Sequence, residues 1–156
     1  MRLTAIAASI LLAPAFLLAA PPAEYYRYAR IIKAEVYGPW GPMVDPGRFA
    51  AQIHAESWFR GDAVSPVGAA GLSQFMPATR TWIVGLYPSL RGFQGDPRFN
   101  PIWSIRALVL YDRHIYDRLG FETSEDEAFA FAYSGFNGGP GWIPRDRALA
   151  SKSGCN

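Results

Sequence analysis

The sequence predicts a mainly α-helical protein with a single domain, and three observations lead to this prediction. The chain has 156 residues, half of them hydrophobic, which is enough for one compact core and too little for two domains of ordinary size. Apolar residues recur at helical spacing in several segments that begin or end at proline, glycine or a capping residue. No segment alternates apolar and polar residues over the length of a strand.

The first twenty residues differ in character from the rest of the chain. After Met1-Arg2, an apolar run from Leu3 to Ala20 contains no charged residue, as in a secretory signal peptide. We therefore expect residues 1–20 to be a leader that is cleaved after Ala20 or Ala23, which places the protein in the periplasm or cell envelope. The alternative is a retained membrane anchor, because the run is just long enough to span a bilayer.

Charge and cysteine content exclude several classes of function. The formal net charge is +2, and removal of Arg2 with the leader leaves 14 basic against 13 acidic residues. The basic residues form no stripe or recognition helix, so no nucleic-acid partner is expected. The single cysteine, Cys155, can form no disulfide within the chain and no Cys-His metal site, and no cysteine follows the apolar run as a lipoprotein would require.

Two helices are expected before the middle of the chain. The first covers Glu24 to Tyr37, and the segment Gly38-Pro39-Trp40-Gly41-Pro42 is expected to end it because proline and glycine interrupt the helical hydrogen-bond ladder. The second begins near Pro46-Gly47-Arg48 and runs to about Phe59, before Arg60-Gly61-Asp62.

Glu56 has an unusual position on the second of these helices. Phe49, Ile53 and Glu56 stand at positions i, i+4 and i+7, so the carboxylate falls on the stripe that should face the core. A carboxylate in such a place is paired, protonated, or lines a cleft where burial raises its pKa, which suits a general acid. The alternative is an ordinary surface salt bridge with Arg60 at i+4. Periodicity alone leaves both interpretations open.

A loop rich in glycine and small residues follows, from Ser65 to Gln74. Such a loop allows backbone to approach a bound ligand closely, although it is also a common form of plain turn. The Gly-Lys-Ser/Thr ending of a phosphate-binding loop is absent, so no nucleotide site is expected. Met76-Pro77-Ala78-Thr79 then opens a third helix with proline in its first turn.

Two longer helices are expected in the second half of the chain. Asn100-Pro101 predicts an N-cap and a first-turn proline before a helix from Ile102 to about Leu119, whose apolar residues recur at core spacing. Ser124 and Glu127 predict a capping box at the start of the next helix, which Gly138-Gly139-Pro140-Gly141 should end. A last helix is expected around Arg145-Asp146-Arg147.

Three motifs occur in order along the chain, namely Ala51-Gln52-Ile53-His54-Ala55-Glu56-Ser57, Ser65-Pro66-Val67-Gly68-Ala69-Ala70-Gly71-Leu72-Ser73-Gln74-Phe75-Met76-Pro77-Ala78-Thr79 and Phe136-Asn137-Gly138-Gly139-Pro140-Gly141-Trp142. Together they resemble the soluble lytic transglycosylases related to goose-type lysozyme. The match extends from about Phe49 to Arg147 and includes Phe99-Asn100-Pro101. The resemblance implies a lysozyme-like catalytic domain over residues 24–156, which we expect to be shortened at its C-terminus because relatives usually continue further.

The resemblance also implies roles for individual residues. In that family the glutamate of the Glu-Ser pair is the catalytic acid/base, the serine contacts substrate, and the Gly-Leu-Met-Gln and Ala-Tyr-Asn motifs border the sugar groove. Catalysis is thereby assigned to Glu56. The residues assigned to sugar binding are Ser57, Gly71, Ser73, Gln74, Phe136 and Asn137.

Two residues depart from the family pattern. Ser73 replaces the usual methionine, and Phe136 replaces the tyrosine whose hydroxyl would lie near the catalytic carboxylate. Tyr133, three residues earlier on the same helical face, is a candidate to supply that hydroxyl, and we include it among the substrate-binding residues. Aromatic core packing is the alternative for both Tyr133 and Phe136.

The implied reaction needs only one carboxylate. Hydrolytic glycosidases generally use two, yet no Asp or Glu occurs between Asp62 and Asp96. In the transglycosylase reaction Glu56 protonates the bond between N-acetylmuramic acid and N-acetylglucosamine. It then takes the proton of the muramic C6 hydroxyl, which closes a 1,6-anhydro ring without water, metal or cofactor.

The sequence leaves two alternatives to this reaction open. A hydrolytic muramidase would need Asp62 or Asp45 near Glu56, and an inactive peptidoglycan-binding or secretion-associated factor is conceivable because of Phe136. In each case the expected partner is the glycan strand of peptidoglycan, bound by a monomer, and contact with a membrane is expected only through an uncleaved leader. The active forms would degrade cell wall and cause bacteriolysis.

Overall fold

The computed structural model describes residues 20–119 and 124–152. Within these ranges the chain forms the α-helices α1 (Ala23–Trp40), α2 (Gly47–Ser57), α3 (Pro77–Leu86), α4 (Pro101–Tyr116), α5 (Glu125–Gly138) and α6 (Trp142–Lys152), with 3₁₀ turns η1 (Pro88–Leu90) and η2 (Pro97–Phe99). The only extended pairing among the described residues is two isolated bridges, from Ala70 to Val64 and to Phe75. The prediction of a mainly α single domain is confirmed by this architecture.

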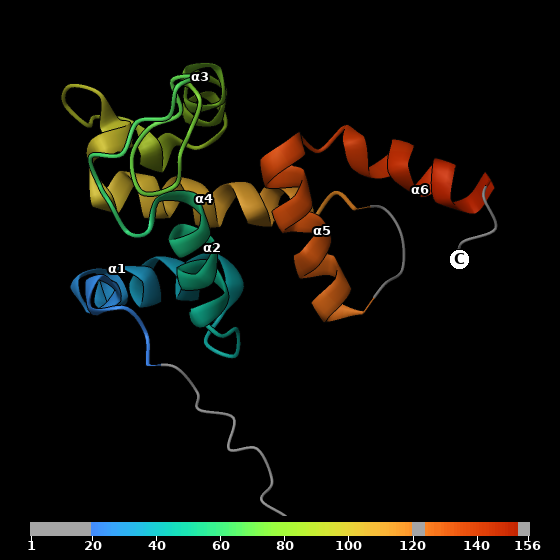
Figure 1. Ribbon diagram of the computed structural model, residues 1–156, viewed down its shortest axis with the longest axis horizontal. Helices are drawn as coiled ribbons and strands as arrows, with labels where there is room; N and C mark the ends of the chain where they lie inside the picture. The colour runs from blue at the N-terminus through green and yellow to red at the C-terminus, as the bar shows by residue number, and fades with distance from the viewer. Residues whose placement is uncertain (1–19, 120–123, 153–156) are drawn as a thin grey trace, which may run out of the picture.

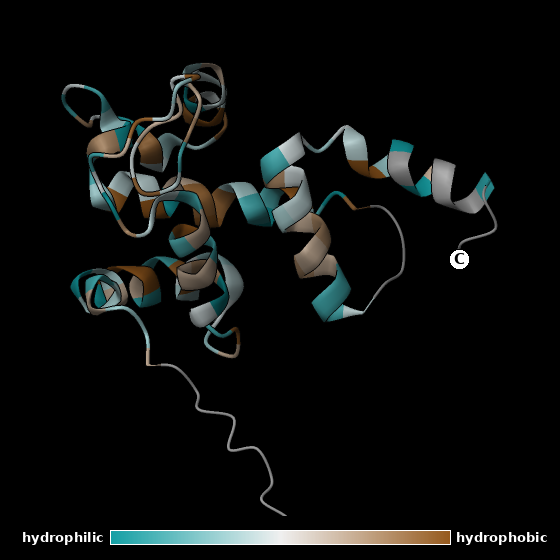
Figure 2. Cartoon of the chain, in the orientation of Figure 1, coloured by the Kyte–Doolittle hydropathy of each residue, from teal (hydrophilic) through white to brown (hydrophobic). Residues whose placement is uncertain are grey.

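Helix α4 lies at the centre of the fold and packs against α1 and α5 (Figure 1). Hydrophobic residues gather on α1, α3 and the middle of α4 (Figure 2), whereas α6 extends away from these helices (Figure 1). The fully buried residues of α4 are Trp103, Ser104, Ile105, Ala107, Leu108, Val109 and Ile115. The predicted core role of this helix is therefore confirmed.

Helix α1 continues beyond the predicted end at Tyr37 and includes Pro39 in its last turn. Proline leaves one bond of the helical ladder unmade. Trp40, the last residue of the helix, is buried, and its indole N–H donates to the carbonyl of Val109 at 3.1 Å. The early end was wrong because burial of this indole, which packs edge-on against Phe49, outweighs the loss of one backbone hydrogen bond.

Helix α2 ends at Ser57, slightly before the predicted end at Phe59. Trp58 and Phe59 both adopt positive φ, at 55° and 60°, so the chain leaves the helix in a left-handed turn. Phe59 is buried there and stacks on Tyr28 with ring centroids 6.3 Å apart. This turn leaves Glu56 in the last turn of the helix.

The predicted capping residues are confirmed in the structure. The Asn100 side chain accepts hydrogen bonds from the backbone N–H groups of Ile102 at 3.0 Å and Trp103 at 3.2 Å. Ser124 and Glu127 form the complete capping box at the start of α5. Each cap satisfies backbone donors that a helix start leaves without partners, which explains why these two helices begin where the sequence indicates.

The predicted leader, residues 1–20, lies outside the described residues except for Ala20, and Cys155 also lies outside them. Between residues 20 and 119 and between residues 124 and 152, no helix has both the length and the apolar character needed to cross a membrane.

Candidate active site

Glu56 lines a cavity of about 320 Å³ where the end of α2 meets the loop 63–76, α3, α4 and α5. The lining residues are Glu56, Ser65, Ala69, Gln74, Phe75, Met76, Thr79, Tyr111, Phe136 and Asn137. Glu56 is the one carboxylate among these described lining residues. The cavity thus brings together residues from all three sequence motifs.

The carboxylate of Glu56 is half-buried, and burial raises its pKa above the ordinary glutamate value. No hydrogen bond or ion pair links it to another residue in the part of the chain that the structure describes. Arg60 instead donates its Nε–H to the carbonyl of Ser57 at 3.1 Å. The surface salt bridge between Glu56 and Arg60 is therefore not formed, and the carboxylate is available to a ligand in the cavity.

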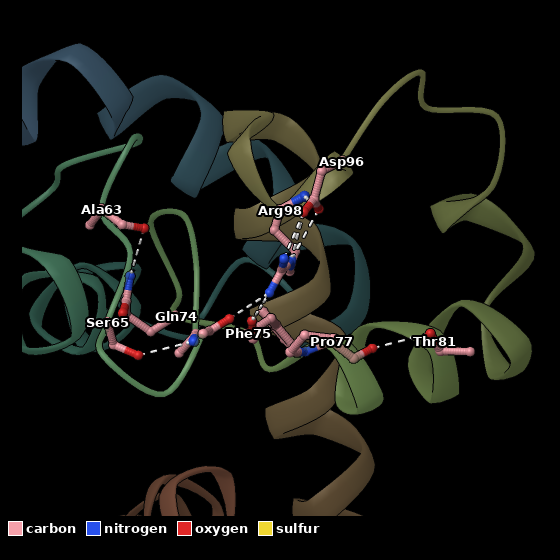
Figure 3. Close-up of polar contacts among 10 residues, drawn as sticks. Ala63, Ser65, Gln74, Phe75, Pro77, Thr81, Asp96 and Arg98 are labelled. Carbon is pink, nitrogen blue, oxygen red and sulfur yellow. Dashed lines mark hydrogen bonds and ion pairs between the residues drawn. The ribbon is translucent and has the colours of Figure 1, made fainter.

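Arg98 holds the loop that forms one wall of the cavity (Figure 3). Its Nη1 donates to the carbonyl of Gly68 at 2.8 Å and to that of Phe75 at 3.0 Å. Asp96, which caps η2, forms an ion pair with the same guanidinium at 2.6 Å. A single side chain therefore joins two points of the loop that are seven residues apart in sequence.

Gly71 serves the packing of this loop. Its φ is +78°, and a Cβ at this position would lie 1.8 Å from the carbonyl oxygen of Arg98. The residue is buried and does not line the Glu56 cavity. Close approach of backbone to backbone, rather than to a ligand, explains the glycine here, and the predicted contact of Gly71 with sugar stays a prediction.

Ser57 and Ser73 are both buried, and neither lines the Glu56 cavity. The hydroxyl of Ser57 donates to the carbonyl of Ile53 at 3.3 Å, one turn earlier in α2. Ser73 donates its backbone N–H to the hydroxyl of Ser104 at 3.1 Å and its own hydroxyl to the carbonyl of Ser104 at 3.0 Å. Both serines thus have partners within the fold, and their predicted sugar contacts stay predictions.

Gln74 lines the cavity from a left-handed backbone position, with φ at +47°. Its amide nitrogen donates to the carbonyl of Gly71 at 2.9 Å. It also donates to the carbonyl of Ala63 at 3.3 Å (Figure 3). These bonds fix the side chain and leave its amide oxygen as an acceptor for a ligand.

Helix α5 contributes Phe136 and Asn137 to the cavity, but not Tyr133. The ring of Phe136 lies 5.4 Å from the ring of Phe75 and 5.4 Å from that of Tyr111. Tyr133 lines a second, neighbouring cavity. The predicted hydroxyl donor on this helix therefore does not face Glu56.

Tyr111 is a lining residue that the sequence analysis missed. It lies on α4, is 6% exposed, and brings the one phenolic hydroxyl found among the described lining residues. Burial raises its pKa, and the neighbouring Asp112 adds to the shift, so the hydroxyl stays protonated. Helical periodicity assigned this stretch to the core, and no local pattern distinguished Tyr111 from its buried neighbours.

The carboxylates considered for a hydrolytic mechanism lie elsewhere. Asp62 is exposed and does not line the Glu56 cavity, while Asp45 accepts a hydrogen bond from the backbone of Gly47 at 2.8 Å and lines a separate hollow. Asp112 is buried, and its pKa is raised to about 8 chiefly by burial and further by the charge of Glu56. It is therefore protonated at neutral pH and does not provide a second charged carboxylate.

Between residues 20 and 119 and between 124 and 152, no group of three or more His, Cys, Asp and Glu side chains is placed to hold a metal ion. Comparison with protein families gives a match to the transglycosylase SLT domain over residues 38–154, which includes every residue that lines the Glu56 cavity. No curated protein and no solved structure matches the chain. Because the family match covers three-quarters of the sequence, the chain belongs to the transglycosylase SLT domain family, a lysozyme-like family that acts on peptidoglycan.

Proposed function

We propose that the protein is a lytic transglycosylase that cleaves the β-1,4 bond between N-acetylmuramic acid and N-acetylglucosamine and leaves 1,6-anhydro ends. One observation carries the proposal: Glu56 is half-buried in a cavity whose described lining contains no second carboxylate. A one-carboxylate site suits a reaction in which the same group acts first as acid and then as base.

Glu56 has the properties that both steps need. Burial raises its pKa, so the acid form persists closer to neutral pH and can protonate the leaving glycosidic oxygen. The resulting carboxylate then accepts the proton of the muramic C6 hydroxyl as that oxygen bonds to C1. Because the nucleophile belongs to the substrate, the site needs no water-activating group, and ring closure has the entropic advantage of an intramolecular reaction.

Gln74, Asn137 and Tyr111 are the polar neighbours that would orient the sugar and the carboxylate. The first two belong to the family motifs, and Tyr111 supplies a hydroxyl from α4 to the same cavity as Phe136. We propose that Tyr111 takes the place of the motif tyrosine that Phe136 replaces. The site would then differ from the family pattern in the helix that carries the hydroxyl, rather than in lacking one.

The proposal extends to location and biological effect. A protein that cleaves glycan strands acts where peptidoglycan lies, outside the cytoplasm. Together with the charge-free apolar run from Leu3 to Ala20, this supports export to the periplasm or cell envelope through the leader. Cleavage there would weaken the wall and produce bacteriolysis.

The products of glycan cleavage test the reaction directly. We expect digestion of purified peptidoglycan to yield 1,6-anhydromuramic ends, and we expect the same yield in the presence of a chelator. Mass spectrometry distinguishes these ends from hydrated reducing ends by the mass of one water. Mainly reducing ends would establish a muramidase, absence of any product would leave a peptidoglycan-binding protein, and inhibition by the chelator would contradict metal-free catalysis.

The contribution of Tyr111 can be separated from that of Tyr133. We expect Tyr111→Phe to lower turnover about fivefold, the equivalent of about 1 kcal/mol for one neutral hydrogen bond. Tyr116→Phe is the matched control, because Tyr116 lies on the same helix but lines neither the Glu56 cavity nor the cavity beside it, and this change should not alter turnover. We expect Phe136→Tyr to raise activity or leave it unchanged. If Tyr133→Phe lowers turnover and Tyr111→Phe does not, the hydroxyl that assists Glu56 belongs to Tyr133 on α5.

A further inference from the structure

A second cavity of about 420 Å³ adjoins the Glu56 cavity between α2, α4 and α5. Each of these helices lines both cavities with neighbouring residues: α2 with Gln52 and Glu56, α4 with Asp112 and Tyr111, and α5 with Tyr133 and Phe136. The two cavities are thus successive hollows along the same three helices. We call the second one the Asp112 cavity.

Asp112 is a buried polar residue that lines this cavity. It is 4% exposed, and one of its carboxyl oxygens accepts a hydrogen bond from the Gln52 amide at 3.3 Å. The other oxygen has no hydrogen-bond partner among the described residues. No fully buried side-chain oxygen in the described ranges is left without a partner, so this second oxygen keeps some accessible surface. Because Asp112 lines the cavity, we infer that a ligand there can reach this oxygen.

The cavity has the character of a site for an uncharged polar group. Burial raises the pKa of Asp112 to about 8, so at neutral pH the carboxyl can both donate and accept a hydrogen bond. Phe49 and Phe129 provide an apolar wall beside it. At the mouth, Arg48 lies over the ring of Phe129, 4.5 Å from its centroid, and forms an ion pair with Asp126, so the two opposite charges compensate each other.

We propose that the Asp112 cavity binds the N-acetyl group of a second amino sugar of the glycan strand, away from the bond that Glu56 cleaves. The inference rests on the proposed function, which makes a glycan the substrate. An acetamido group has one N–H donor, one carbonyl acceptor and one methyl group. These match the acceptor and donor of the Asp112 carboxyl and the aromatic wall of Phe49 and Phe129. The volume lies within the range of small-ligand sites.

Binding can be measured without cleavage in the full chain carrying Glu56→Gln. The probes are the hexamer of N-acetylglucosamine and the hexamer of glucosamine, which lacks the acetyl groups, each titrated by calorimetry. Asp112→Leu keeps the branched shape of the side chain and removes its polar atoms. We expect this change to lower the affinity for the N-acetylated hexamer about tenfold, which corresponds to about 1.4 kcal/mol of binding free energy. The affinity for the glucosamine hexamer should change less than about twofold.

Two further variants make the test specific. Asp112→Asn retains a donor and an acceptor, so it should bind both hexamers as the parent does, and loss of binding here would indicate an ionic role and overturn the proposal. Ala130→Phe places a ring in the cavity from an exposed position on α5 and leaves the buried residues Gln52 and Asp112 unchanged. It should lower the affinity for the N-acetylated hexamer only. Asp117→Leu, an exposed residue after α4 outside both cavities, is the control and should change neither affinity.

The outcomes are decisive in each direction. Equal affinities in Asp112→Leu and the parent, or equal weakening of both hexamers, would overturn the N-acetyl subsite. If Asp112→Leu does not fold, as judged by circular dichroism, Ala130→Phe decides the question alone. Cleavage of peptidoglycan by the unmodified protein reports separately on the proposed function. If the unmodified protein cleaves peptidoglycan but the variants bind the two hexamers in the same ratio as the parent, only the subsite is refuted. If the unmodified protein does not cleave peptidoglycan but the variants lose affinity for the N-acetylated hexamer alone, only the reaction is refuted.

Discussion

Replacing Glu56 by glutamine is expected to abolish glycan cleavage while the helical fold remains intact. Glutamine keeps the size of the side chain but can neither donate nor recover the proton that both steps transfer. General acid/base groups contribute at least about a hundredfold to rate, so residual activity in purified Glu56→Gln should fall below about one per cent. Circular dichroism would check the fold, because Glu56 makes no hydrogen bond to another described residue that its loss could break.

A matched control is Asp62→Asn, which neutralises an exposed carboxylate outside the cavity. We expect it to retain full activity, whereas a loss comparable with that of Glu56→Gln would favour a two-carboxylate muramidase.

The pH profile of activity provides a second check on the assignment of Glu56. Burial raises the pKa of Glu56, so the acid form that protonates the glycosidic oxygen persists to higher pH. We therefore expect kcat/KM to decline with rising pH only above the pH range in which an exposed glutamate loses its proton. A decline already complete at the ordinary glutamate pKa would contradict the assignment.

Replacing Gly71 by alanine is expected to destabilise the fold by about 3 kcal/mol, because two costs add at this position. The backbone has φ at +78°, which an L side chain adopts only with strain, and the new Cβ would meet the carbonyl oxygen of Arg98 at 1.8 Å. The backbone must therefore shift. Thermal denaturation should show a fall in Tm of about 10 °C for a domain of this size.

Gly68→Ala separates the two costs. Gly68 lies in the same loop with φ at +87°, but a Cβ there would have no neighbour within 4 Å. We expect a loss of only about 1 kcal/mol, the cost of the left-handed backbone alone. Similar changes in Tm for Gly68→Ala and Gly71→Ala would show that the contact with Arg98 adds nothing.

Features with a local cause could be predicted from the sequence. Asn100 and Ser124 cap their helices through side chains that reach backbone groups two or three residues away. The position of Glu56 on the buried stripe of α2 follows from helical periodicity, since Phe49 and Ile53 on the same stripe are 1% and 0% exposed. In each case the neighbours in sequence are also the neighbours in space.

Features that depend on distant segments could not be predicted. The partner of Ser73 is Ser104, 31 residues away, and only the packing of the loop against α4 reveals it. Tyr111 and Asp112 are adjacent in sequence but line different cavities, because consecutive residues of a helix point about 100° apart. The extension of α1 through Pro39 depends on a site for the Trp40 indole that other helices create.

The way Arg98 holds its loop has a consequence for the thermodynamics of glycan binding. The carbonyls of Gly68 and Phe75 are bonded to its guanidinium, and the Gln74 side chain is bonded to the loop backbone. A wall that the protein's own hydrogen bonds hold in place loses little conformational entropy when a sugar binds. The affinity of this wall for sugar is then governed by the contacts that the ligand makes and by the water that it displaces, with little correction for ordering the loop.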